Sequence, residues 1–178
     1  NKANDSGVVI NMGDTDSYNQ GRIKYDNSDN SLTFRTTGSD RLRITHQGNF
    51  QFTDKDSGHI GGGFYSRTKT VNNTGDSTTS FMRFTLEHGA IAGMIYLTGS
   101  NSGCSVARVY SFAAQYGQTV YTNSLSDTGQ YSGKHFSFTS STNNNQHTFM
   151  VQVSGGTQEV NMTVHLGNAN QNVTYTEL

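Results

Sequence analysis

Short runs in which apolar and polar side chains alternate, each ending at Gly, Asn or Asp, constrain this chain most strongly. Alternation with a period of two places the apolar side chains on one face of a β-strand. Ser, Thr, Asn and Gly make up nearly half of the chain and interrupt every stretch that could form a helix. Residues 109–116 are a weak helical candidate, and their neighbours favour a strand. We therefore expect an all-β fold.

The first part of the chain, residues 1–65, contains a series of short alternating segments. They lie at 8–10, 22–25, 31–35, 41–45 and 50–52. Each segment offers few apolar side chains, and a lone hairpin of this kind is marginally stable. The segments must therefore stack on one another or on other copies of the chain. We expect them to form a short, intertwined β shaft or neck.

Residues 66–178 carry longer alternating segments, roughly eight or nine in all, at a spacing typical of antiparallel sandwiches and jelly rolls. Examples are Met82 to Leu86, Ile91 to Leu97 and Val160 to Leu166. Gly61 to Gly63 break the pattern between the two regions and mark the expected boundary. We therefore expect two domains, a shaft segment at 1–65 and a jelly-roll-like β-sandwich head at 66–178.

The apolar content is low for 178 residues, because 31% of the chain is hydrophobic and 14% is charged. So few apolar side chains make a thin core, and since association would bury more surface, we expect an oligomer.

With a net charge of −1 and no basic block, no nucleic-acid partner is expected. No apolar run is long enough for a membrane-spanning helix, so membrane insertion is not expected. The chain opens with Asn1-Lys2-Ala3-Asn4 and has no starting Met, so we expect it to be a piece of a longer polypeptide.

Residues 21–49 hold three motifs in a defined order. Ile23-Lys24-Tyr25-Asp26 is followed by the segment from Ser31 to Thr36, and then by Arg41 to Ile44 ahead of a Gly-Asn turn. This order resembles a recurrent segment of tailed-bacteriophage tail fibres, which lies just upstream of a distal head. The resemblance carries over to the later residues only in their general character, and the usual Gly-Ile-Gly ending is altered to His59-Ile60-Gly61.

The resemblance implies a homotrimer at the distal end of an extracellular virion tail fibre, with further fibre upstream. Its head would attach the phage to a host-surface receptor, a glycan or an outer-surface protein, by non-catalytic binding. Arg41 and Arg43 share one strand face, so in a trimer we expect them to pair with Asp40 or Asp54 of a neighbouring copy. The alternatives are an extracellular carbohydrate-binding or adhesin module from another protein and a polysaccharide depolymerase.

We expect neither a metal, nor a cofactor, nor catalysis. The six His lack metal-ligand spacing. The Asp-x-Asp pairs at 14–16 and 54–56 lack the Gly and distal Glu of an EF-hand, and turns at strand ends explain them. Hydrolysis of a polysaccharide would need paired carboxylates at a suitable separation. The adjacent Glu87 and His88 would point to opposite faces of a strand.

Tyr and Asn side chains in the expected loops of the head are the candidate receptor-binding groups. Tyr adds a large contact area with few torsions, and Asn adds adaptable hydrogen bonds. A sugar would stack on an aromatic ring and bond to nearby amides, and a protein loop would use the same groups. The candidates are Tyr116, Tyr121, Asn123, Tyr131, Asn143, Asn144 and Asn145.

Overall fold

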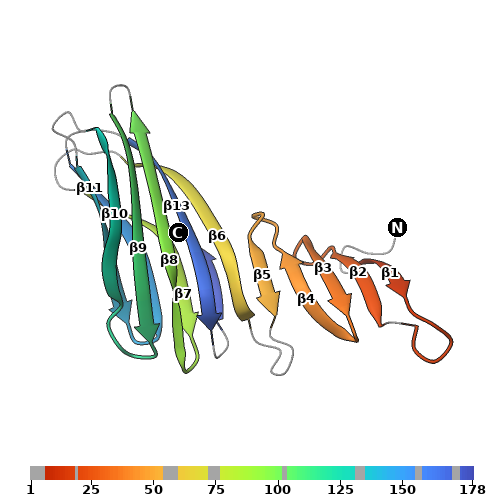
Figure 1. The fold of residues 1–178 in the computed structure, drawn as a ribbon. Coiled ribbons are helices and arrows are strands. Elements are labelled where there is room, and N and C mark those ends of the chain that lie inside the picture. The colour runs from red at the N-terminus through yellow and green to blue at the C-terminus, as the bar shows by residue number, and fades with distance from the viewer. Residues whose placement is uncertain are drawn as a thin grey trace. The chain divides into compact units, whose positions relative to one another are not determined.

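A computed structural model describes residues 7–18, 20–53, 60–71, 77–101, 104–130, 135–154, 158–169 and 173–178 (Figure 1). All the regular elements among these residues are β-strands, and every pairing described is antiparallel. The all-β prediction is confirmed, and residues 109–115 lie in a strand. The described residues include no helix that could cross a membrane.

The fourteen strands follow one another through the whole described chain. They are β1 (Val8–Met12), β2 (Gly21–Asp26), β3 (Ser31–Thr36), β4 (Ser39–Ile44), β5 (Phe50–Thr53), β6 (Ile60–Val71), β7 (Ser77–Leu86), β8 (Ala90–Asn101), β9 (Cys104–Gln115), β10 (Tyr121–Gln130), β11 (His135–Asn143), β12 (Gln146–Ser154), β13 (Gln158–Ala169) and β14 (Val173–Glu177).

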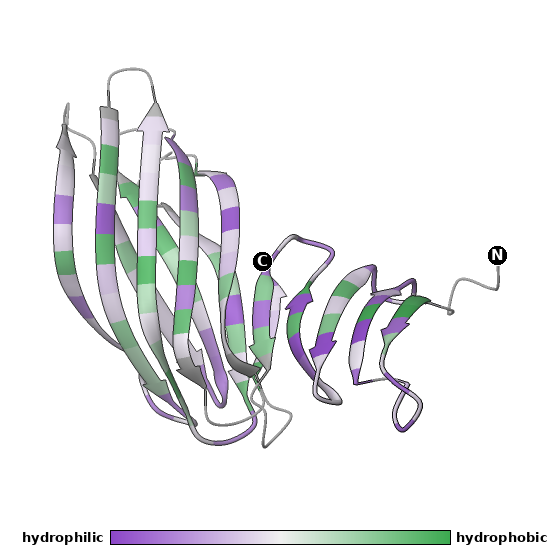
Figure 2. Cartoon of the chain, turned by 45° about the vertical axis from the view of Figure 1, so that its right-hand side comes forward, coloured by the Kyte–Doolittle hydropathy of each residue, from purple (hydrophilic) through white to green (hydrophobic). Residues whose placement is uncertain are grey.

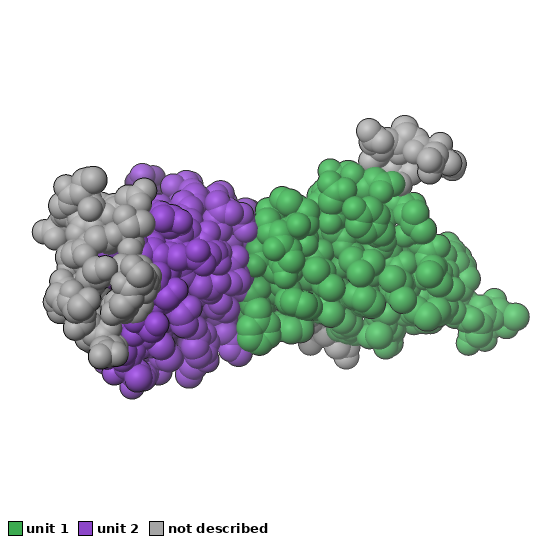
Figure 3. Space-filling model, turned by 90° about the horizontal axis from the view of Figure 1, so that it is seen from above, with its two compact units in different colours: residues 1–64 green, residues 65–178 purple. Residues whose placement is uncertain are grey.

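Contacts divide the chain into two compact units, residues 1–64 and 65–178 (Figure 3). Strand β6 contributes residues to both units, since its first residues pair with β5 in unit 1. The glycines Gly61 to Gly63 lie inside β6 and do not interrupt the strand. Glycine was expected to end the pattern here; the strand instead continues, with a shift of its register against β5 between Phe52 and Thr53 that leaves Gly61 unpaired with β5.

Unit 1 is a single antiparallel sheet with the strand order β1-β2-β3-β4-β5-β6. Residues paired on neighbouring strands share a face, so the register assigns each side chain to one side of the sheet. One side, which we call the apolar face, carries Val8, Ile10, Met12, Ile23, Tyr25, Leu32, Phe34, Leu42, Ile44, Phe50, Phe52 and Phe64. Figure 2 shows the resulting alternation of hydrophobic and hydrophilic bands along these strands.

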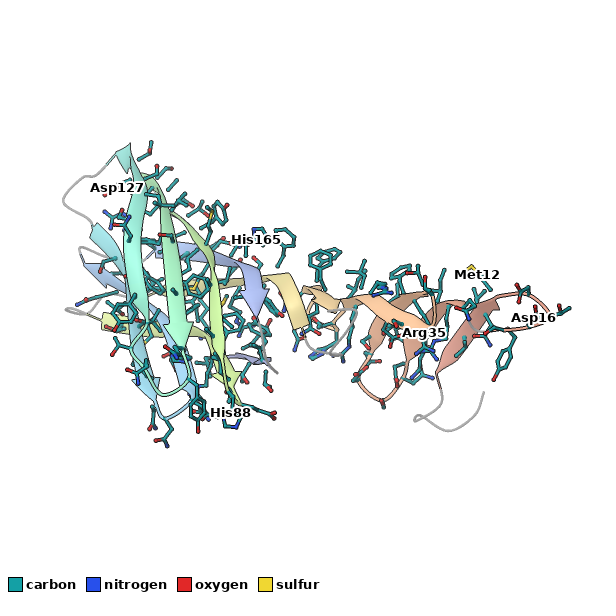
Figure 4. All side chains as sticks on the ribbon, turned by 60° about the horizontal axis from the view of Figure 1, so that its bottom comes forward. Met12, Asp16, Arg35, His88, Asp127 and His165 are labelled. Carbon is teal, nitrogen blue, oxygen red and sulfur yellow. The ribbon has the colours of Figure 1, made fainter. Side chains whose placement is uncertain are left out.

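The opposite side of unit 1, the polar face, is held by ion pairs within the chain. Arg22 and Arg35 both contact the Asp40 carboxylate, at 3.2 and 2.8 Å. Lys24 lies 2.6 Å from Asp26. Figure 4 shows Met12 on one side of the sheet and the Arg35 guanidinium on the other. The carboxylate of Asp40 is therefore already paired inside its own chain.

Arg41 and Arg43, which we expect to pair with a neighbouring copy in a trimer, both have partners within their own chain, and pairing between copies stays a prediction. Arg43 contacts the carboxylate of Asp29 in its own chain. Arg41 donates a hydrogen bond to Thr36 Oγ1 at 3.3 Å, again within the chain. The other expected partner, Asp54, lies outside the described residues. Turn residues between β2 and β3 reach the Arg43 side chain, and strand alternation alone could not reveal this.

Unit 2 has two antiparallel sheets, β6-β13-β8-β9-β10 and β11-β12-β7-β14, that form a sandwich-like fold. Aromatic rings from the two sheets meet in the core: Tyr65 lies 5.2 Å from Phe84, and Phe112 lies 5.1 Å from Phe149. The alternation predicted for residues 91–97 is confirmed, since Ile95 is buried while its neighbours in sequence are about 40% exposed. Every buried apolar side chain among the described residues belongs to unit 2.

Candidate binding site

Three connecting segments of unit 2 meet at one end of its two sheets. They join β7 to β8 (87–89), β9 to β10 (116–120) and β11 to β12 (144–145), and we call them the loop cluster. The backbone N–H of Tyr116 donates to the Gly89 carbonyl at 2.8 Å. The N–H of Leu86 donates to the Asn145 carbonyl at 3.0 Å. These bonds tie the segments together, and Figure 4 places His88 at this end and Asp127 at the other.

An open hollow of about 440 Å³, which we call the Tyr116 hollow, lies beside the loop cluster. It is lined by Tyr116, Gly117, Gln118, Thr119, Thr142 and Asn144. The Tyr116 side chain is 44% exposed, and the His88 ring lies 5.0 Å from its ring at an angle of 45°. The histidine therefore supports an aromatic ring that remains open to solvent. None of the described residues that line the hollow carries a charge.

Asn144 reaches the hollow because of the tight turn in which it lies. Asn143 pairs with Gln146, which leaves a two-residue connection between β11 and β12. Asn144 has a φ of 55°, in the left-handed region that Asn tolerates better than most other residues. Its neighbour Asn145 contributes its backbone carbonyl to the loop cluster. The three asparagines thus have different roles, and only Asn144 lines the hollow.

Thr142 connects the hollow to a buried histidine. Its hydroxyl lies 3.2 Å from Nδ1 of His147, which is fully buried. Burial lowers the pKa of His147, because a charged imidazolium is poorly solvated there. Its Nε2 atom has no hydrogen-bond partner among the described residues. A neutral imidazole therefore holds the threonine hydroxyl at the edge of the hollow.

The remaining predicted residues lie elsewhere. Tyr121 is 68% exposed and lies opposite Ala113, where it lines a smaller, largely apolar hollow of about 280 Å³. Asn123 lies opposite Ser111 on the exposed face of the same strand pair. Tyr131 lies outside the described residues. The structure thus brings Tyr116 and Asn144 together and does not bring Tyr121 or Asn123 into their hollow.

Sequence reasoning missed five residues of this site. Gly117, Gln118 and Thr119 follow Tyr116 in one polar loop, so their composition could have identified them. Thr142 and His88 carry no such signal, because they join the site only through strand pairing and through the meeting of separate turns.

Three carboxylates of unit 2, those of Asp127, Glu159 and Glu177, have separate surroundings. Asp127 contacts Arg108 at 3.0 Å, and Glu177 contacts Arg67 at 2.6 Å. Glu159 lines a third hollow, of about 460 Å³, on the exposed side of β8, β9 and β13. Within the part of the chain that the structure describes, no three His, Cys, Asp or Glu side chains form a group that could hold a metal ion.

Comparison with protein-family models, curated proteins and solved structures finds no match to this chain. The chain is characterised by its fold and by its candidate site. It is an all-β protein with a sandwich-like unit that carries an uncharged, Tyr-containing hollow. Its other unit is a single sheet whose apolar face carries exposed side chains such as Val8 and Ile10.

Proposed function

We propose that the chain is the distal part of a homotrimeric virion tail fibre, which attaches a phage to a host-cell surface. In this proposal unit 1 belongs to the shaft, with further fibre upstream, and unit 2 is a jelly-roll-like head that binds the receptor. The observation that carries the proposal is the apolar face of unit 1. The resemblance of residues 21–49 to tail-fibre segments supports it.

The apolar face is too large and too exposed to be left to solvent. Val8 is 66% exposed, Ile10 58%, and Phe50, Phe52 and Phe64 about 40% each. Exposed apolar side chains gathered on one face of a sheet mark an interaction site or an aggregation hazard. Unit 1 is a single sheet, and the described part of the chain provides no second layer for it.

Copies of the same chain fit this face better than an unrelated partner. An interface around a rotation axis brings identical surfaces together, so an apolar face on one copy meets apolar faces on the others. The polar face carries charged side chains that form ion pairs within the chain, such as Arg35 with Asp40. It can therefore face solvent in the assembly. The number of three copies comes from the resemblance of residues 21–49.

Non-catalytic attachment is the role proposed for the head. The Tyr116 hollow combines an exposed aromatic ring with amides and hydroxyls, which suits recognition of a glycan or of a protein loop. Two of the head's carboxylates, Asp127 and Glu177, are engaged in ion pairs. The proposal needs no cofactor, nucleic acid or membrane insertion.

An extracellular carbohydrate-binding or adhesin module is the second candidate, because the same hollow would serve it. The mass in solution separates the two candidates. Light scattering should give three times 19.4 kDa, and a monomer would remove the fibre proposal. Adsorption to a panel of intact bacteria tests attachment itself. Incubation with purified host polysaccharide tests the depolymerase alternative, and shortening of the polymer would overturn the non-catalytic role.

A further inference from the structure

We propose that the Tyr116 hollow binds a neutral sugar residue of the host-surface glycan. The Tyr116 ring would be the stacking platform, and the amides of Gln118 and Asn144 would bond to the sugar hydroxyls. This inference rests on the proposed function and narrows its receptor from a glycan or a protein to an uncharged glycan.

The aromatic platform is held by two contacts within the chain. Tyr116 is held through its backbone by Gly89 at 2.8 Å and through its ring by His88 at 5.0 Å. Its side chain is nonetheless 44% exposed. A ring that is already ordered loses little conformational freedom on binding, which favours even a small ligand. The hollow of about 440 Å³ falls within the range of small-molecule sites.

The polar lining matches the hydrogen-bonding character of a sugar. A carboxamide carries both donors and an acceptor, and a sugar hydroxyl likewise donates and accepts. Gln118 and Asn144 supply two such amides, and Thr119 and Thr142 add hydroxyls. The described lining residues supply no cation for a sulfate, phosphate or carboxylate group. The hollow therefore fits an uncharged sugar better than an acidic one.

A protein ligand is less well served by this hollow. Peptides are recognised by apolar grooves, by free sheet edges or by clusters of charge. The Tyr116 hollow offers one aromatic ring among polar groups. The hollow beside Tyr121, which is lined by Ala90, Ala92 and Ala113, is the better place for an apolar anchor. Finding a protein receptor would therefore contradict the inference.

Saturation-transfer NMR on the full chain tests the inference. The probes are galactose, glucose, N-acetylglucosamine and N-acetylgalactosamine, with N-acetylneuraminic acid as the charged comparator. The test variants are Tyr116→Ala and Asn144→Gly. Glycine accepts the φ of 55° at position 144, so the second variant removes the amide and keeps the turn. Circular dichroism and thermal melting check that each variant folds.

Each variant has a matched control in unit 1. Tyr18→Ala removes an exposed tyrosine, 72% accessible, that lies far along the chain. Asn30→Gly changes an asparagine with a φ of 54° in the turn between β2 and β3. We expect at least one neutral sugar to bind, and Tyr116→Ala to weaken that binding by about tenfold or more. Asn144→Gly should weaken it severalfold, and both controls should leave it unchanged.

Three results would overturn the inference: binding of the acidic sugar alone, binding that survives Tyr116→Ala, or loss of binding in the controls as well. Adsorption to intact bacteria separates this failure from failure of the proposed function. If the chain adsorbs, binds no neutral sugar, and loses adsorption when the cells are treated with protease, the receptor is a protein. The inference then fails while the fibre-tip proposal stands. Neutral-sugar binding by a monomer that adsorbs to no bacterium would instead support a sugar site at the Tyr116 hollow and contradict the fibre-tip proposal.

Discussion

Two neighbouring residues of β1 allow a sharp test of the apolar face. Ile10 belongs to the apolar face and is 58% exposed, whereas Val9 points to the polar face and is 43% exposed. Replacing either by Ser removes a β-branched apolar side chain from the same strand. If the apolar face is the trimer interface, Ile10→Ser should weaken assembly and Val9→Ser should not.

The expected magnitude follows from the exposed fraction of Ile10. Full burial of such a side chain contributes roughly 1.5–3 kcal/mol, so covering the remaining 58% contributes about 1.3 kcal/mol per copy. Three copies then lose about 4 kcal/mol, which lowers the association constant about a thousandfold. The concentration for half assembly of a monomer–trimer equilibrium varies with the inverse square root of that constant, so it should rise about thirtyfold.

Sedimentation equilibrium across a dilution series measures this concentration for the parent chain and for both variants. A rise for Ile10→Ser together with little change for Val9→Ser supports assembly through the apolar face. Equal shifts in the two variants would show that the sheet face does not decide assembly. No shift in either, with the parent chain a stable trimer, would place the interface outside β1.

Three further predictions concern the stability of the single chain. Thr37 has a φ of 51°, which is strained for a β-branched residue, so Thr37→Asn should raise the free energy of unfolding by about 1 kcal/mol in a denaturant titration. The pKa of His147 is lowered in the folded state, so the unfolded chain binds more protons. Its contribution to stability should therefore be complete above about pH 6.5 and be lost as the pH falls below that value. Melting curves from pH 7.5 to 5 should show this loss, and His147→Phe should reduce it. Phe149 is fully buried between Phe84 and Phe112, so Phe149→Ala should cost about 3–5 kcal/mol in urea unfolding, and a cost below about 1 kcal/mol would contradict the described core.

Strand faces in unit 2 were predictable because alternation is a local property. Met82, Phe84 and Leu86 are fully buried as expected. Phe81 is buried as well, which alternation cannot produce. The pairing of β7 with β12 shifts register beside this residue, so a bulge turns two successive side chains inward. A bulge depends on the partner strand, and the sequence of β7 alone contains no sign of it.

The candidate site was only partly predictable for the same reason. Tyr116 and Asn144 could be named from residue type, because exposed Tyr and Asn in loops suit binding. Their common hollow depends on the pairing of β11 with β12 and on the bond between Tyr116 and Gly89. Both involve residues far apart in the chain. The sequence therefore indicated candidate residues, and only the fold could show which of them line the same hollow.

If the chain trimerises and the Tyr116 hollow binds a sugar, as proposed, assembly should strengthen attachment to a cell, and this gives one final prediction. A trimer carries three Tyr116 hollows, and engaging several of them at one surface raises the apparent affinity by roughly 10²–10⁴ without any new contact. A chain whose single hollow binds a monosaccharide weakly can therefore still attach firmly to a cell. Ile10→Ser should leave monosaccharide binding per chain unchanged, because Ile10 lies in unit 1 and the hollow in unit 2. At concentrations where this variant is dissociated, its adsorption to bacteria should fall at least tenfold. Undiminished adsorption by the dissociated variant would show that one hollow suffices, and the apolar face would then need another explanation.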